Sequence, residues 1–238
     1  MGVDIFEIRA EALNCTKCAL AQGRTNVVWA DGNLDSDLLF IGEAPGFHED
    51  KQGLPFVGAA GGLLDRLLAD IGLDRTRAAI VNVIKCRPPG NRDPLPDEIE
   101  SCRPYLDAQL AHMRPKVIVT LGNFATRFIL EQPIGITRAR GQIYERRDAY
   151  VVPTFHPAAA LRGGSFGGVS TMDALRQDMA TVRAVLDGKL PRTDTGAPGD
   201  SSAPDGRGSP RRFGEVPDRG HGSPSEPEAS PSEQLGFF

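Results

Sequence analysis

The chain has 238 residues, 40% of them hydrophobic, which suits one large domain with a buried core. No apolar run reaches the ~18 residues of a membrane helix, and the N-terminus lacks the basic and apolar regions of a signal peptide, so we expect a cytoplasmic protein. The net charge of −4 argues only weakly against a nucleic-acid partner, because the distribution of charge matters more than its sum.

Strand-like and helix-like segments alternate through residues 1–187, which we interpret as one folded domain. In chain order the apolar patterns predict a buried strand at 37–42, a helix at 63–71, a strand at 79–84, a helix at 96–113, a strand at 116–121, a helix at 123–130, a strand or hairpin within 142–152, a fourth main strand at 150–154 and a closing helix at 171–186. This alternation predicts a largely parallel sheet covered by helices on both faces. Ligands of such sheets bind at the carboxyl ends of the strands.

The composition changes abruptly at Gly188. Residues 188–233 are rich in Gly, Pro, Ser, Asp and Arg and almost empty of aliphatic side chains, so they cannot bury enough apolar surface to offset chain entropy. We predict a disordered linker there. The last five residues, 234–238, carry three large apolar side chains and break that pattern.

The chain holds four cysteines, Cys15, Cys18, Cys86 and Cys102, and the first two form a C-x-x-C pair. In a reducing cytoplasm four cysteines are more often metal ligands than disulfides. Their spacing fits a [4Fe–4S] cluster or a structural zinc ion and does not decide between them, and unrelated cysteines are a third reading. A cluster ligated by all four would have no open position for a substrate, so its role would be structural.

Two loops carry residues suited to ligand binding. Gly42 to Gly46 follow the first strand, and their glycines permit a tight turn that holds the carboxylate of Glu43 at its tip. Phe56 stands between a proline and a glycine in a polar segment, where it is either a loop anchor or a stacking surface for a planar base. The first loop lacks the P-loop pattern, which argues against nucleotide triphosphate binding.

Two further polar residues lie at strand ends. Asn82 stands inside a β-branched strand, where its amide either satisfies backbone groups or reads the edge of a base with one donor and one acceptor. His156 follows the last strand and precedes Pro157, which restricts its backbone and helps to fix the direction of its ring. A lone histidine is otherwise most often structural or merely exposed.

Taken together, these segments resemble the family 4 uracil-DNA glycosylases, the iron–sulfur class of the uracil-DNA glycosylase superfamily. The resemblance covers roughly residues 11–187 and rests on GEAPG at 42–46, QGLPFVG at 52–58, NVIKCRPPGNRDP at 82–94, HPAAALR at 156–162 and the positions of the cysteines. It implies a three-layer αβα sandwich with a central, mainly parallel four-stranded sheet, and it favours the [4Fe–4S] cluster over zinc. It also implies an enzyme that flips uracil out of single- or double-stranded DNA and hydrolyses the base–sugar bond without a divalent metal, which initiates base excision repair.

The resemblance also implies a role for individual residues. Phe56 would stack the base, Asn82 would select uracil, and His156 would contact uracil O2. The remaining matches are the acidic Glu43, Gly42 and Ala44 lining the pocket by their backbone, Glu49 near uracil C5 where thymine has its methyl group, and Leu161 or Arg162 in a wedge loop at 157–162.

A sister group of that family has a KRRIH loop whose histidine attaches covalently to DNA. Residues 87–94 here contain no histidine, so we expect turnover and no covalent trapping. Two other classes of protein stay open from sequence alone. A non-catalytic nucleic-acid-binding module would use the cysteines and the basic clusters at Lys85 and Arg87, Arg138 and Arg140, Arg146 and Arg147, and Arg162. An electron carrier would leave GEAPG, Phe56 and His156 unexplained.

The terminal peptide, Gln234 to Phe238, resembles the short Q-L-x-[L/F]-F motif that docks on the bacterial sliding clamp. A tether of this kind would present an apolar anchor to a groove, and an incidental hydrophobic terminus is the alternative. Nothing in the sequence demands an oligomer, so we expect a monomer that works on the nucleoid.

Overall fold

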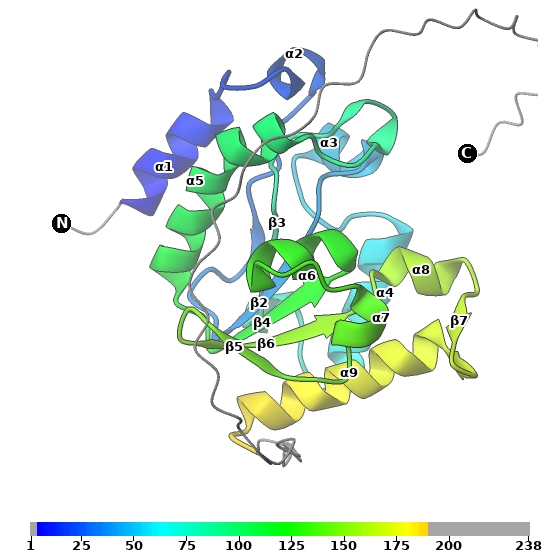
Figure 1. The fold of residues 1–238 in the computed structure, drawn as a ribbon. Helices are drawn as coiled ribbons and strands as arrows, with labels where there is room; N and C mark the ends of the chain where they lie inside the picture. The colour runs from blue at the N-terminus through cyan, green and yellow to red at the C-terminus, as the bar shows by residue number, and fades with distance from the viewer. Residues whose placement is uncertain (1–3, 190–238) are drawn as a thin grey trace, which may run out of the picture. The chain divides into compact units, whose positions relative to one another are not determined.

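The computed structural model describes residues 4–189, and in this part of the chain a six-stranded sheet lies between layers of helices (Figure 1). The strand order is β1-β3-β2-β4-β6-β5. The strands are β1 (Asp31–Gly32), β2 (Leu38–Gly42), β3 (Ala79–Asn82), β4 (Val117–Leu121), β5 (Tyr144–Arg146) and β6 (Ala149–Thr154). The four central strands run parallel, and short antiparallel strands cover both edges. The predicted parallel core is therefore confirmed, the uncertain segment at 142–152 contains β5, and β1 is an addition that the sequence did not reveal.

Helices cover both faces of the sheet. They are α1 (Ile5–Leu13), α2 (Leu20–Gly23), α3 (Phe47–Gln52), α4 (Ala59–Asp70), α5 (Pro96–Met113), α6 (Asn123–Leu130), α7 (Ile136–Ala139), α8 (Pro157–Leu161) and α9 (Thr171–Leu186), with 3₁₀ turns η1 (Arg75–Arg77) and η2 (Pro89–Asn91) and a small hairpin of β7 (Ser165–Phe166) and β8 (Val169–Ser170). The predicted limits of α5 and α9 are confirmed because both starts carry strong signals. Pro96 opens α5, where Glu98 accepts the Leu95 N–H at 2.8 Å, and Ser170 caps α9 by accepting the Asp173 N–H at 3.1 Å.

Alternate residues of the central strands enter two separate cores. On β2, Leu39 and Ile41 pack with α1, α5 and α6, whereas Leu38 and Phe40 pack with α4 and α9. All of these side chains are buried, so both faces of the sheet are covered and the strands read as continuous apolar runs. This arrangement is the predicted three-layer αβα sandwich.

The register of the parallel strands brings their carboxyl ends to one edge of the sheet. Gly42 at the end of β2 lies opposite Asn82 at the end of β3, and Leu121 of β4 lies opposite Thr154 of β6. The loops that leave these four strands therefore start side by side, as expected for a ligand site of this fold class.

None of the helices in residues 4–189 combines the length and apolar character needed to cross a membrane. The predicted linker at 188–233, apart from its first two residues, and the terminal peptide at 234–238 lie outside the described part of the chain.

Candidate active site

A cavity opens at the carboxyl edge of the sheet, and residues from all four motif segments line it. The walls include Glu43, Ala44, Glu49, Phe56, His156 and Arg162. The segments that supply them are far apart in sequence, and the fold brings them to one cavity. Their roles at this cavity stay predictions. Gly42, Asn82 and Leu161 do not line it, and Gly42 lies against the Phe56 ring that forms part of its wall.

Gly42 is packed against both Phe56 and Asn82. A side-chain carbon added at Gly42 would come within 2.3 Å of Asn82 Oδ1 and 2.8 Å of the Phe56 ring. Position 42 can therefore carry no side chain without displacing both residues. On the other side, the Phe56 ring lies 5.4 Å from the His156 ring between centroids, with 32° between their planes. Phe56 thus connects the Asn82 end of the site to the His156 end.

Asn82 has an unused hydrogen-bond donor. Its side chain is 1% exposed, and its Nδ2 atom has no hydrogen-bond partner among the described residues. A buried amide without a partner costs about 1–3 kcal/mol, so it is uncommon unless a ligand supplies the missing acceptor. The alternative that Asn82 satisfies backbone groups is not supported for this atom.

The His156 ring is half-buried and held in one orientation. Its Nδ1 atom accepts the N–H of Ala158 at 3.2 Å, at the start of α8. In the neutral ring this leaves the proton on Nε2. Burial, and then the positive charge of Arg162, lower the pKa of His156 to about 4, so the ring is neutral at pH 7. His156 is therefore a neutral hydrogen-bond donor at the wall of the cavity.

Glu43 is half-buried at the tip of the loop after β2. Burial, and then the negative charge of Asp93, raise the pKa of its carboxyl group. Asp93 comes from the loop between η2 and α5 and lines the same cavity. Glu43 is thus a carboxylate with increased basicity, a property suited to proton transfer and to stabilising positive charge.

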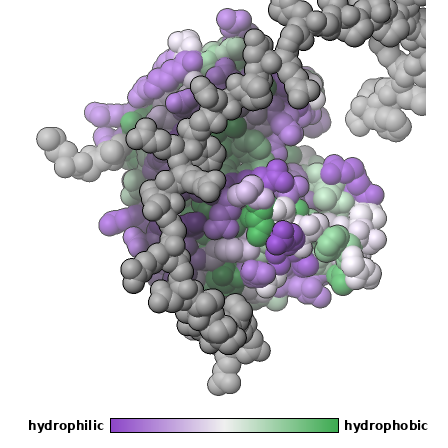
Figure 2. Space-filling model, in the orientation of Figure 1, coloured by the Kyte–Doolittle hydropathy of each residue, from purple (hydrophilic) through white to green (hydrophobic). Residues whose placement is uncertain are grey.

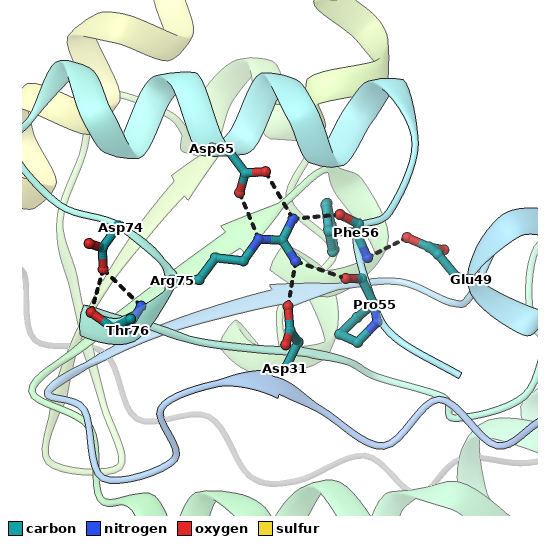
Figure 3. Close-up of polar contacts among 8 residues, drawn as sticks. All are labelled: Asp31, Glu49, Pro55, Phe56, Asp65, Asp74, Arg75 and Thr76. Atoms are coloured by element: carbon teal, nitrogen blue, oxygen red, sulfur yellow. Dashed lines mark hydrogen bonds and ion pairs between the residues drawn. The ribbon is translucent and has the colours of Figure 1, made fainter. Parts of the chain in front are cut away.

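Glu49 holds two parts of the pocket wall together. One of its carboxylate oxygens accepts the Gly46 N–H at the start of α3, and the other accepts the Phe56 N–H at 2.5 Å. The segment 49–58, which the sequence suggested to be a polar loop, begins in the last turns of α3. The predicted contact of Glu49 with the C5 edge of uracil stays a prediction, while its clamp on Phe56 is visible (Figure 3).

Phe56 has an unusual backbone. Its φ of 53° lies in the left-handed region, which costs a residue with a side chain about 1–2 kcal/mol. Its carbonyl oxygen lies against Gly61, where an added side-chain carbon would come within 1.6 Å. The close approach of α4 to this carbonyl therefore requires glycine at position 61.

The predicted wedge loop at 157–162 is a short helix, α8, because Pro157 and the His156 cap favour a helical start. Leu161 ends this helix with 46% of its side chain exposed, and Arg162 follows it at the cavity rim. Figure 2 shows hydrophobic and neutral residues over α8 and β7, where Leu161 and Phe166 are exposed. The wedge role of Leu161 or Arg162 stays a prediction.

Sequence reasoning missed the contribution of β4. Gly122 follows this strand with a φ of 93°, and a side-chain carbon there would come within 3.4 Å of His156 Cβ. Asn123 lines the cavity and accepts the N–H of Ile136 at 2.7 Å, which fixes α7 beside it. The sequence did hold a signal for these two residues, because Gly122 and Asn123 directly follow a predicted central strand, and ligands bind at the carboxyl ends of such strands. They were interpreted only as the start of a helix.

The four cysteines line a second cavity, formed by α1, α2, α5 and the segment after β3. Cys86 lies four residues beyond the end of β3, which stops at Asn82 and not at residue 84 as predicted, and Cys102 lies in α5. None of the four is in a disulfide. Residues 4–189 contain no group of three or more His, Cys, Asp or Glu side chains close enough to hold one metal ion.

Hydrogen-bond donors point at three of the sulfur atoms. Lys17 N–H donates to Cys15 at 3.5 Å, Lys85 N–H to Cys102 at 3.2 Å, and the Arg24 guanidinium to Cys86 at 3.4 Å. Burial raises the pKa of Cys86 to about 11 and also raises the pKa of Cys102. The donors and the buried thiols suit a group that brings positive charge to the sulfurs.

Lys85 lines the cysteine cavity and contacts the end of β3. It is almost completely buried, and its ammonium donates to the Asn82 carbonyl at 2.6 Å and to Gln109 Oε1 at 2.5 Å. Burial lowers its pKa to about 8, against the opposing influence of Cys102 and Cys86. The same residue therefore contacts a cysteine through its backbone and the strand end at Asn82 through its side chain.

Comparison with known proteins places this architecture and site in a family. Residues 29–179 match the model of the uracil DNA glycosylase superfamily, and the chain belongs to that superfamily. Within it, the chain belongs to the type-4 uracil-DNA glycosylases. It is 49% identical to the type-4 uracil-DNA glycosylase of Sulfurisphaera tokodaii over 65% of this chain and 74% of the relative. The type-4 enzymes of Archaeoglobus fulgidus (47%, over 65% and 82%) and Thermotoga maritima (46%, over 68% and 86%) are similarly close.

Proposed function

We propose that this protein is an enzyme that removes uracil from DNA by hydrolysing the N-glycosidic bond and so initiates base excision repair. The observation that carries the proposal is the unpartnered side-chain amide of Asn82, buried beside Gly42 at the end of β3 in a type-4 family member whose strand-end cavity is lined by Phe56 and His156. Such an amide suits the edge of uracil, which presents the N3–H donor beside the O4 acceptor. The substrate is single- or double-stranded DNA that contains uracil.

Substrate binding begins with flipping of the nucleotide out of the stack, at a cost of a few kcal/mol. Phe56 then stacks the base, and Asn82 donates Nδ2–H to O4 and accepts N3–H on Oδ1. Gly42 and Ala44 line the slot by their backbone, Glu49 stands near C5, and Leu161 or Arg162 fills the space that the base leaves. The exposure of Leu161 and Arg162 beside the cavity supports this last assignment.

Bond cleavage places negative charge on uracil O2 and positive charge on the sugar. The Nε2–H of neutral His156 is the donor that we assign to O2, because Nδ1 is already occupied by Ala158. Glu43 has the position and raised basicity to stabilise the cationic sugar or to activate the attacking water. Neither role needs a divalent metal.

The direct test is excision from an oligonucleotide with one uracil, followed by alkali to cleave the abasic site. We expect a nick with the uracil strand, alone or paired, and none with a matched thymine strand. Binding without a nick in either uracil substrate would favour the alternative of a non-catalytic nucleic-acid-binding module.

We further propose that Cys15, Cys18, Cys86 and Cys102 bind a structural [4Fe–4S] cluster. The four side chains line one cavity, and donors already point at three of the sulfurs. A zinc ion with bonds of ~2.3 Å needs its sulfurs within about 4 Å of one another. In a cluster each cysteine binds a different iron, so wider sulfur separations are accommodated. When bound, the cluster joins α1, α2, α5 and the segment after β3.

The purified protein is expected to absorb near 400 nm and to contain about four irons per chain. Cys102→Ser should lower the iron content and the midpoint of thermal unfolding, because a buried ligand that ties α5 to the sheet is weakened. Ser101→Ala, next to it on α5, is the matched control. A colourless protein with one zinc per chain would contradict the cluster.

We also propose that the enzyme acts as a monomer on nucleoid DNA in the cytoplasm, where four free thiols remain available to iron. The peptide 234–238 would recruit it to the sliding clamp. Deletion of residues 234–238 should abolish clamp binding and leave excision from short oligonucleotides unchanged. Clamp binding that survives the deletion would dismiss this recruitment.

A further inference from the structure

Arg75 lies outside every motif that identifies the family site, yet its guanidinium contacts the segment that carries Phe56 (Figure 3). It stands on η1, which connects α4 to β3, and a quarter of its side chain is exposed. Nη2 donates to the Phe56 carbonyl at 2.6 Å, and Nη1 donates to the Pro55 carbonyl at 3.3 Å. The guanidinium therefore binds two consecutive backbone carbonyls, those of Pro55 and Phe56.

Two carboxylates fix the plane of the guanidinium. Asp65 on α4 accepts from Nε at 2.6 Å and from Nη2 at 3.4 Å, and Asp31 on β1 accepts from Nη1. These contacts and the two carbonyl contacts match the five N–H donors of an arginine, so the group is held in one orientation. A lysine could supply the charge at this position but not the planar fork.

The Phe56 peptide units are therefore held from both sides. Glu49 accepts the Phe56 N–H, and Arg75 donates to its carbonyl, while the φ of 53° between them is one that a residue with a side chain rarely adopts. A backbone in this region persists only when its surroundings determine it. The direction of the Phe56 ring, between Gly42 and His156, depends on this backbone.

We propose that Arg75, oriented by Asp31 and Asp65, is a positioning residue that holds Phe56 in its left-handed conformation and thereby places the stacking surface for the flipped base. This inference rests on the proposed stacking role of Phe56. Arg75 touches no substrate in this assignment and acts only through Phe56.

The test is a double-mutant cycle in single-turnover excision from a uracil oligonucleotide, with DNA affinity measured in parallel. We expect Arg75→Met to slow excision about tenfold to a hundredfold, because small misplacements of a positioning group have effects of this size, with a smaller change in DNA affinity. In a Phe56→Ala background the same substitution should have no further effect, since the ring that it positions is gone. Arg77→Met, on the same turn with an exposed side chain, is the matched control and should leave the rate unchanged.

Thermal unfolding of each variant separates positioning from stability. If Arg75→Met does not fold, Arg75→Lys and Asp65→Asn replace it in the same cycle. Each of these variants disturbs the orientation of the charged group at position 75 but keeps some of its hydrogen bonds. If Arg75→Met slows excision equally in the wild-type and Phe56→Ala backgrounds, the positioning role of Arg75 is overturned, while the stacking role of Phe56 is not affected. A wild-type rate for Phe56→Ala would overturn the stacking role as well, and so the two failures are distinguishable.

Discussion

His156→Ala is expected to slow uracil excision by about a hundredfold to a thousandfold, the usual effect of removing one donor to a developing oxyanion. The physical reason is that Nε2–H is the donor at the cavity wall, with Nδ1 engaged by Ala158. The measurement is the single-turnover rate at saturating enzyme, with folding checked by thermal unfolding. His48→Ala is a matched control, since His48 lines the outer wall of the same cavity and is exposed. A near wild-type rate for His156→Ala would remove it from the reaction.

The lowered pKa of His156 adds a dependence on pH to the same experiment. Because the ring stays neutral down to about pH 4, excision should show no step from His156 between pH 6 and 8. In the unfolded chain the ring takes up a proton near pH 6.5, so between pH 6.5 and 4 the unfolded state binds more protons than the folded state. This component of stability is present above pH 6.5 and is lost as the pH falls to 4. His156→Ala should therefore lose less stability than the wild type between pH 7 and 5 in urea unfolding.

Asn82→Ala is expected to slow uracil excision about a hundredfold, since two hydrogen bonds to the base are lost. Asn82→Asp is the sharper variant. A buried, protonated aspartate can donate to N3 of cytosine and accept from its amino group, so this variant should release cytosine that the wild type leaves in place. The measurement is single-turnover excision from matched uracil and cytosine oligonucleotides. Asn82→Ala is the control, because it removes the amide and offers cytosine nothing.

Failure of Asn82→Asp to release any cytosine, in a variant that folds, would count against Asn82 as the reader of the base. Retention of full uracil activity by Asn82→Ala would count against it more strongly. In that case the unpartnered Nδ2 atom would need another explanation.

The sequence predicted the parallel core because both of its signals are local. Residues such as Leu38 to Ile41 form apolar runs that only a sheet buried on both faces accommodates, and Pro96 and Ser170 mark helix starts. The edge strand β1 was missed because Asp31 and Gly32 carry no strand pattern and are ordered by pairing with β3. Short helices such as α3 and α8 were missed for a similar reason, since one or two turns give too little periodicity to detect.

The site was predictable where a motif stands at a strand end, as with Glu43, Asn82 and His156. The candidate site was not predictable where a residue reaches it from a segment that is distant in the sequence. Asp93 and Gly122 belong to other segments, and only the fold brings them to Glu43 and His156. Arg75 is the extreme case, because its partners Asp31, Asp65 and Phe56 come from three separate elements.

The burial of Lys85 sets a condition for anyone who wishes to engineer an iron-free repair enzyme from this scaffold. Its ammonium is almost completely enclosed, and negative charge on the nearby sulfur atoms of Cys102 and Cys86 favours its charged form. Exchanging Cys86 and Cys102 for apolar residues would leave this buried cation with the Asn82 backbone carbonyl and Gln109 as its hydrogen-bond partners. Lys85 and Gln109 would have to be redesigned in the same step, so the cysteine cavity and the end of β3 form a single unit of redesign.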